Sequence, residues 1–216
     1  YYWKVKIDTN KGATNWSAPA FWTTGLFNEA DWQGQWIGLD RAAPGDSETQ
    51  WSRLAARYLR KEFAVKKDVK RATVHIAGMG LYELFINGQR IGNQVLAPAP
   101  TDYRKTILYN TYDVTSLLQT ENAIGVTLGN GRFYTMRQNY KPYKIPTFGY
   151  PKLRLNLIVE YADGSKETIA TNTSWKLTTE GPIRSNNEYD GEEYDARKEL
   201  GAWTQTGYDD LSLIHI

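Results

Sequence analysis

The fold is decided by one stretch, Leu81-Tyr82-Glu83-Leu84-Phe85-Ile86-Asn87-Gly88. Its first six residues are mostly aromatic or aliphatic, as is typical of a β-strand. Asn-Gly is the residue pair that a two-residue type I′ turn favours, because both turn positions adopt positive φ. The stretch therefore predicts a strand that ends in a tight hairpin.

Further short strands with turn signals between them extend in both directions from this hairpin. The segment 71–76 alternates in polarity, and from Leu153 to Tyr161 every second residue is apolar while Arg154, Asn156 and Glu160 occupy the other face. Asp163-Gly164 then turns the chain back. Other strands are expected near residues 57–63, 106–112 and 124–128, with one helical turn over 114–118 capped by Asp113 and a short helix within 45–50.

These strands predict an all-β chain whose main domain is an antiparallel β-sandwich of jelly-roll, galactose-binding-like type, because closing two sheets on one core hides most strand edges. We predict the domain boundaries as follows: strands of a truncated domain at 1–25, a linker at 26–35, the jelly-roll at 36–210 and a non-native cloning tail at 211–216. The tail, Leu211-Ser212-Leu213-Ile214-His215-Ile216, is expected to pack on nothing.

Composition excludes several classes of function. The 26 Lys and Arg nearly balance the 24 Asp and Glu, which argues against a nucleic-acid partner. No run reaches the ~18 consecutive apolar residues of a membrane helix, so no membrane partner is expected. With 2 His and no Cys, the chain has little to offer a transition metal or a thiol nucleophile. The compartment stays open, with a secreted or periplasmic location favoured.

Carboxylates are the remaining candidates for catalysis. Asp190, Glu192, Glu193 and Asp195 gather beside Arg197. Glycosidases need two carboxyl groups that face each other across a sugar, roughly 5–9.5 Å apart and usually from separate elements. Neighbours in one loop are more often solvated charges or turn caps. No catalytic residue is therefore assigned.

Several motifs in fixed order resemble the N-terminal β-sandwich region of bacterial α-L-rhamnosidases, glycoside hydrolases that remove terminal L-rhamnose. These motifs are Trp36-Ile37-Gly38, Gly80–Gly88, Ile91–Pro98, Thr101–Lys105, Tyr109–Leu118, Leu128–Tyr134 and Tyr189–Arg197. Ahead of them, residues 1–25, with Trp16-Ser17-Ala18-Pro19, resemble the last strands of a fibronectin-type or immunoglobulin-like domain.

The resemblance implies a non-catalytic fragment, because in that family a C-terminal α/α barrel carries the chemistry. The expected function is an accessory or carbohydrate-binding domain with L-rhamnose-containing glycans as ligands; the alternative is a purely structural module that supports the barrel. Calcium is the one cofactor implied, with candidates Asn93, Asn139 and Pro146. Amides stand at Asn93 and Gln94, and an amide brings less charge to calcium than a carboxylate, which predicts weak binding.

An aromatic stretch from Arg132 to Tyr150 is the most suggestive binding surface, because flat rings can cover the apolar face of a sugar while amides and cations bind its hydroxyls. The stretch could equally use its rings as its own small core or to dock a neighbouring domain. Since sandwich loops cluster at the ends of the sheets, it is expected to face Asn93 and Gln94. The carbohydrate-binding candidates are Asn93, Gln94, Arg132, Tyr134, Asn139 and Tyr140.

Overall fold

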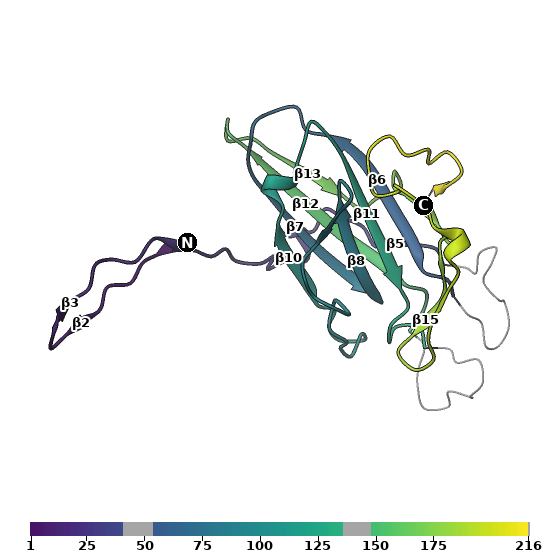
Figure 1. Ribbon diagram of the computed structural model, residues 1–216, viewed down its shortest axis with the longest axis horizontal. Coiled ribbons are helices and arrows are strands. Elements are labelled where there is room, and N and C mark those ends of the chain that lie inside the picture. The colour runs from purple at the N-terminus through teal and green to yellow at the C-terminus, as the bar shows by residue number, and fades with distance from the viewer. Residues whose placement is uncertain (41–53, 136–147, 216) are drawn as a thin grey trace. The chain divides into compact units, whose positions relative to one another are not determined.

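The computed structural model describes residues 1–40, 54–135 and 148–215, and its chain divides into two compact units, 1–32 and 33–216 (Figure 1). In the first unit, β1 (Tyr2–Trp3) pairs with β4 (Ala20–Phe21), and β2 (Asp8–Thr9) pairs with β3 (Gly12–Ala13). A short 3-10 helix, η1 (Glu29–Asp31), follows.

This first unit is a ribbon whose large apolar side chains are exposed. Its strands have only two residues each, and two strands alone bury little surface. Tyr1 stacks on Trp22 with ring centroids 4.4 Å apart, yet both rings remain more than half exposed at 72% and 51%. The ribbon therefore has no core of its own.

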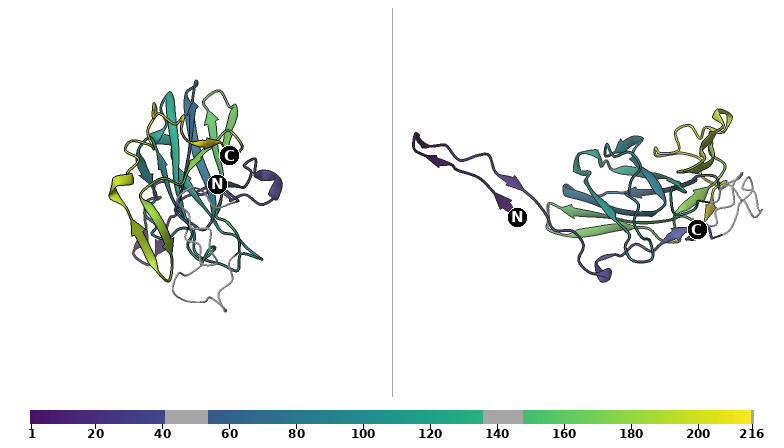
Figure 2. Two further views of the ribbon diagram at one scale, coloured as in Figure 1. Left: turned by 90° about the vertical axis from the view of Figure 1, so that its right-hand side faces the viewer. Right: turned by 90° about the horizontal axis from the view of Figure 1, so that it is seen from below.

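The second unit is a sandwich of two antiparallel sheets (Figure 2). The first sheet has the order β10 (Tyr109–Asp113), β7 (Val69–Met79), β12 (Lys152–Tyr161) and β13 (Lys166–Ala170), and β5 (Ile37–Gly38) also pairs with β12. The second sheet has the order β17 (Ile214–His215), β14 (Lys176–Thr178), β6 (Arg57–Ala64), β11 (Glu121–Gly129), β8 (Leu81–Ile86) and β9 (Gln89–Ile91).

The described part of this unit also contains four smaller elements. β15 (Ile183–Asn187) and β16 (Gly191–Tyr194) form a separate hairpin, and η2 (Thr115–Leu117) and η3 (Ala196–Lys198) are single 3-10 turns. The predicted helical turn is confirmed as η2, where the Asp113 carboxylate accepts hydrogen bonds from the Thr115 backbone N–H at 3.0 Å and its hydroxyl at 2.6 Å. The helix expected within 45–50 lies outside the described residues.

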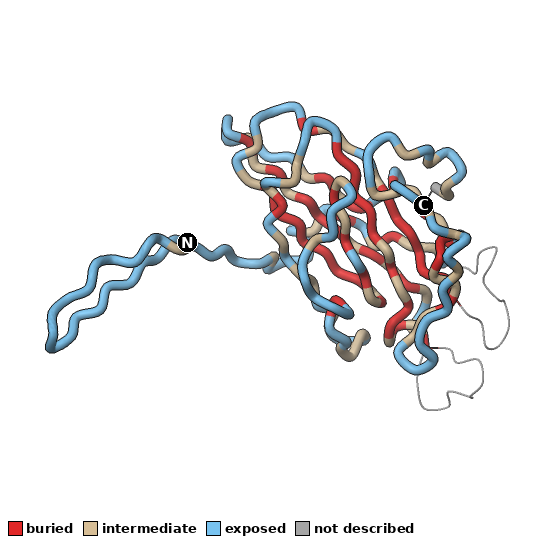
Figure 3. Tube along the Cα trace, viewed as in Figure 1, coloured by how far each residue is buried: buried red, intermediate tan, exposed pale blue. Residues whose placement is uncertain are grey.

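The core lies between the two sheets and explains the alternation in the sequence (Figure 3). Alternate residues of β12 are fully buried against those of β7, and strands of the second sheet supply the opposite side. Members of the core include Val74, Ile76, Leu153, Leu155, Leu157 and Val159 from the first sheet, and Leu59, Leu84, Ile86, Ile124, Val126 and Leu128 from the second. The all-β sandwich prediction is confirmed.

The hairpin at Asn87-Gly88 is also confirmed. Asn87 has φ of 51° and Gly88 φ of 81°, the left-handed values of a type I′ turn, and the turn joins β8 to β9.

No helix in the described part of the chain is long and apolar enough to cross a membrane.

One expectation about the C-terminal tail is wrong. Ile214 and His215 form β17, which pairs with Leu177 and Lys176 of β14. The tail was expected to pack on nothing because its short apolar run follows no cap or turn signal. An open edge of β14 accepts it, since unpaired strand edges are templates for further pairing. Its non-native origin stays a prediction.

Candidate functional site

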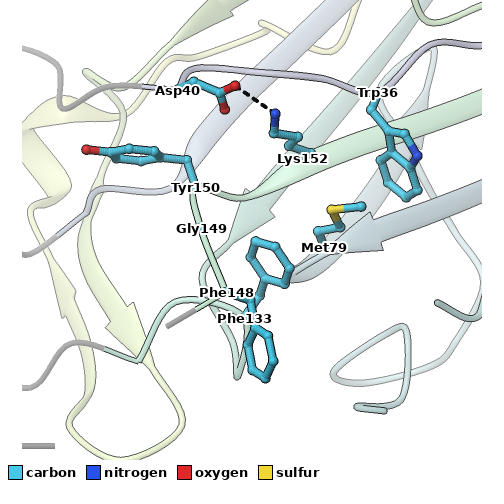
Figure 4. A pocket seen from close by; sticks show the side chains of 8 residues that line it. All are labelled: Trp36, Asp40, Met79, Phe133, Phe148, Gly149, Tyr150 and Lys152. Atoms are coloured by element: carbon cyan, nitrogen blue, oxygen red, sulfur yellow. Dashed lines mark hydrogen bonds and ion pairs between the residues drawn. The ribbon is translucent and has the colours of Figure 1, made fainter. Parts of the chain in front are cut away.

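A hollow of about 470 Å³ opens at one end of the first sheet. Side chains from four separate segments surround it (Figure 4), and most of them are aromatic or otherwise apolar. The lining residues are Trp36, Asp40, Met79, Phe133, Phe148, Gly149, Tyr150 and Lys152.

Strand alternation places the floor of the hollow on the outer face of the sheet. Leu153 points into the core, so its neighbour Lys152 points outward. Lys152 lies opposite Met79 of β7 on one side and opposite Gly38 of β5 on the other. Gly38 leaves space there, because a Cβ at this position would lie 3.3 Å from the Lys152 Cγ.

An ion pair closes one side of the hollow. The Lys152 ammonium donates to the Asp40 carboxylate at 2.7 Å (Figure 4), and the two side chains are 31% and 65% exposed. A second cation lies two residues along β12, where the Arg154 guanidinium sits 6.0 Å from the centre of the Trp36 ring. The Arg154 Nε also donates to the Gly34 carbonyl at 2.6 Å.

Two lining rings, Phe133 and Phe148, pack together with Tyr103. Tyr103 meets Phe133 and Phe148 edge-on, with centroid distances of 5.2 and 5.3 Å, and the two Phe rings stack at 5.9 Å. The Phe148 N–H donates to the Phe133 carbonyl at 2.9 Å, which fixes one ring against the other. Burial raises the pKa of the Tyr103 hydroxyl, which stays neutral and suits an apolar wall.

Flat rings beside an ion pair suit a ligand that is apolar on one face and polar at its edges, as a sugar is. In the described part of the chain, no three His, Cys, Asp or Glu side chains come close enough to hold a metal ion.

Arg132 and Tyr134, two of the predicted binding residues, lie next to the hollow and already have protein partners. The Arg132 guanidinium donates to the Glu188 carboxylate in the β15–β16 turn, and this hydrogen bond raises the Arg132 pKa. Tyr134 stacks on Tyr150 with centroids 6.1 Å apart. Tyr134 thus adds a second layer behind one lining ring.

Asn93 and Gln94 are exposed residues after β9, where their loop is held from two directions. The Gln94 amide oxygen accepts from the Tyr112 hydroxyl at 3.1 Å. The Arg90 guanidinium donates to the Gly92 and Gln94 carbonyls at 3.4 and 2.8 Å. The Arg90 guanidinium thus already occupies these carbonyls, and calcium at this loop stays a prediction. Asn139, Tyr140 and Pro146 lie outside the described residues.

Glu192 and Glu193 are exposed neighbours on β16. Successive residues of a strand point to opposite faces, so these two carboxylates cannot face each other across one sugar. The nearby Asp195 carboxylate accepts from the Arg197 backbone and guanidinium, and the hydrogen bond with the Arg197 side chain lowers the Asp195 pKa to about 2.

None of the eight residues that line the hollow is among the predicted carbohydrate-binding residues. Phe133, Phe148 and Tyr150 belong to the aromatic stretch noted in the sequence, but Trp36, Asp40, Met79 and Lys152 come from elsewhere. The sequence offered one signal for this site, which was Lys152 at the outward-facing end of an alternating strand. The residues beside Lys152 could be identified only from the strand register.

The fold defines an antiparallel jelly-roll β-sandwich domain preceded by an immunoglobulin-like ribbon. Residues 67–216 match the family model described as "Alpha-L-rhamnosidase N-terminal domain", and residues 1–28 match "Rha78A-like, N-terminal immunoglobulin domain". The chain belongs to the α-L-rhamnosidase N-terminal domain family.

Individual relatives agree with this assignment. An α-L-rhamnosidase of Formosa agariphila is 39% identical over 98% of the chain. Among solved structures, α-L-rhamnosidases of Dictyoglumus thermophilum and Aspergillus terreus match with TM-scores of 0.82 and 0.86, identities of 40% and 36%, and coverage of 99% and 98% of this chain. The chain spans 24% of the length of each of these three proteins.

Proposed function

We propose that this chain is a non-catalytic accessory domain of an α-L-rhamnosidase and that its hollow binds a sugar of a rhamnose-containing glycan. The observation that carries the proposal is the hollow itself, which is lined by Trp36, Met79 and Phe148 together with the Lys152–Asp40 pair. One related structure is a Streptomyces avermitilis α-L-rhamnosidase complexed with L-rhamnose, with a TM-score of 0.69, 31% identity, and coverage of 98% of this chain and 22% of that one.

The direct test is calorimetric titration of the whole chain with L-rhamnose, with and without calcium. A monosaccharide presents few atoms and must displace bound water, so we expect a dissociation constant on the order of millimolar to tens of micromolar. Trp36→Ala should abolish binding, because it removes the largest ring of the hollow. Tyr194→Ala, at an exposed tyrosine that does not line the hollow, should bind as the parent does.

A further variant separates the hollow from the loop after β9. Asn93→Ala should leave rhamnose binding unchanged if the sugar occupies the hollow, and should weaken it if the sugar lies on that loop. Calcium that improves the affinity of the parent but not of Asn93→Ala would favour the loop. Retention of full affinity by Trp36→Ala would contradict the proposed site.

The alternative is a purely structural module, and one observation favours it. The side chains of Val95 and Leu96 are 80% and 70% exposed. Leu96 is held in this position by a left-handed backbone with φ of 60°, which is strained for a bulky residue. Apolar side chains held outward in this way suit burial against another domain. A parent chain that binds no sugar at high concentration would favour this alternative.

The proposal also predicts that this chain releases no rhamnose from an aryl rhamnoside, since its adjacent acids lack the opposed geometry of a glycosidase. Release of the aryl group can be followed by absorbance. Turnover that disappears in Glu192→Gln or Glu193→Gln would overturn the non-catalytic assignment.

A further inference from the structure

We infer that the hollow prefers an acidic sugar, whose carboxylate or sulfate group takes the place of the Asp40 carboxylate on Lys152. This inference rests on the proposed function and specifies its ligand. It starts from the charges around the hollow: Lys152 lines it, Arg154 lies over the Trp36 ring, and Asp40 is the one acid among the lining residues.

The two cations share one face of β12 because they are two residues apart on a strand. Arg154 is held by its hydrogen bond to the Gly34 carbonyl and by the Trp36 ring, so its charge stays beside the hollow. Lys152 has only 31% of its side chain exposed, and its ammonium is thus directed by the surrounding side chains rather than by solvent.

The Asp40 carboxylate is the replaceable part of this arrangement. Its side chain is 65% exposed, and an ion pair that solvent reaches contributes little to stability. A ligand anion can therefore replace Asp40 at little cost. Its sugar ring would then lie against the Trp36 and Phe148 rings, which a free anion cannot use.

The experiment compares sugars that differ in one group: D-glucose, D-glucuronate and D-glucose 6-sulfate, each titrated into the whole chain at low ionic strength. We expect one or both anions to bind more tightly than glucose. Preference for glucuronate alone would identify a uronic acid, and preference for the sulfate alone would identify a sulfated sugar. Raising the salt to physiological strength should reduce the preference, because exposed charges are screened.

Two variants change the charge of the hollow in opposite directions, and a third is a control. Asp40→Asn should tighten binding of the preferred anion by up to about fivefold, because it removes the competing carboxylate. Lys152→Met should abolish the preference over glucose. Lys166→Met, at an exposed lysine of β13 that pairs with Glu160, is the matched control and should change neither affinity nor preference. Melting temperatures verify that each variant is folded.

Equal affinities for glucose and both anions in the parent would overturn the inference, as would unchanged or weaker anion binding in Asp40→Asn. If Lys152→Met does not fold, the Asp40→Asn and salt series still decide. Rhamnose binding that depends on Trp36 without any anion preference would leave the proposed function intact and remove this inference alone. Absence of binding by any sugar would remove both.

Discussion

Gly34 stands where the chain enters the sandwich, and its backbone is enclosed by β12. Its N–H donates to the Asn156 amide oxygen at 2.8 Å, and its carbonyl accepts from Arg154. A Cβ added to Gly34 would lie 2.5 Å from the Leu155 carbonyl oxygen and 2.7 Å from the Thr171 hydroxyl. Backbone at such a distance cannot move aside without disturbing the first sheet.

Gly34→Ala should therefore destabilise the sandwich by about 1–3 kcal/mol, the usual cost of overpacking a closed site. Urea unfolding followed by tryptophan fluorescence measures the change. Gln35→Ala is the matched control, since the Gln35 side chain is exposed and its backbone hydrogen bonds to Thr171 are kept. Equal midpoints for the parent and Gly34→Ala would contradict the enclosure described here.

His75 is a second residue whose environment has a measurable consequence. Burial lowers the pKa of His75 below its ordinary value of 6.5, and the positive charge of Arg71 lowers it further. The unfolded chain then binds a proton at this position at a higher pH than the folded chain does. Stability contributed by the neutral ring is present above pH 6.5 and decreases as the pH falls toward the depressed pKa.

We expect the free energy of unfolding to decrease between pH 7.5 and 5.5, by at most about 1.4 kcal/mol per pH unit from this residue. The His75 Nδ1 and the Thr111 hydroxyl form a hydrogen bond at 3.0 Å. His75→Gln should remove that part of the slope, because an amide can keep this hydrogen bond without titrating. Urea titrations of both proteins across the range provide the test. Parallel pH profiles would show that His75 does not contribute.

At the scale of elements, several contacts attach the C-terminal strap, residues 203–210, to the outer face of the second sheet, and Arg60 makes three of them. Arg60 of β6 has a side chain only 1% exposed. Its Nε donates to the Trp203 carbonyl at 3.0 Å, its guanidinium donates to the Gln205 carbonyl at 2.9 Å, and it pairs with Asp210. The strap thus covers Arg60 and depends on it.

Arg60→Met should lower the free energy of unfolding by about 2–4 kcal/mol. The Trp203 and Gln205 carbonyls and the partly buried Asp210 carboxylate would each lose the hydrogen bond that Arg60 donates. Lys176, which also pairs with Asp210 at 2.5 Å, keeps the loss below that of a fully isolated charge. Chemical unfolding gives the loss of stability, and limited proteolysis should cut the strap faster. Arg104→Met, at a side chain 75% exposed, is the control and should stay within about 0.5 kcal/mol.

The elements that the sequence predicted are those with their own periodicity or turn chemistry. β8 and its Asn87-Gly88 turn, and β12 with its alternating apolar face, were found where expected because local residues determine them. β14 has only three residues, and the strap has no regular structure at all. Both are held by partners far along the chain, such as Arg60, and no local pattern encodes such contacts.

At the scale of the whole molecule, the predicted and the observed sites differ for the same reason: local residues determine some features and distant partners determine others. Aromatic residues near 133 and 148 could be recognised from composition, but the hollow also needs Trp36, Met79 and Lys152, which are brought together by the register of β5, β7 and β12. Register depends on which faces are buried across both sheets. A site assembled from separate strands therefore becomes visible only once the sheet is ordered.

The tail, residues 211–216, contributes to the stability of the whole sandwich through its contacts with β14. Ile214 and His215 pair with β14, and Leu213 and Ile214 are half-buried, so removing the tail exposes an edge of the second sheet. For a chain of this size a loss of about 1 kcal/mol corresponds to a fall of about 2–4 °C in melting temperature, and we expect a fall in this range when residues 211–216 are deleted. Leu211→Ser, at a side chain 88% exposed, should leave the melting temperature unchanged and is the control. Differential scanning calorimetry measures both variants. β17 adds only two residue pairs at an edge. A fall of ten degrees in melting temperature would therefore mean that the tail supports far more than this edge. No fall would mean that the pairing with β14 contributes nothing to stability.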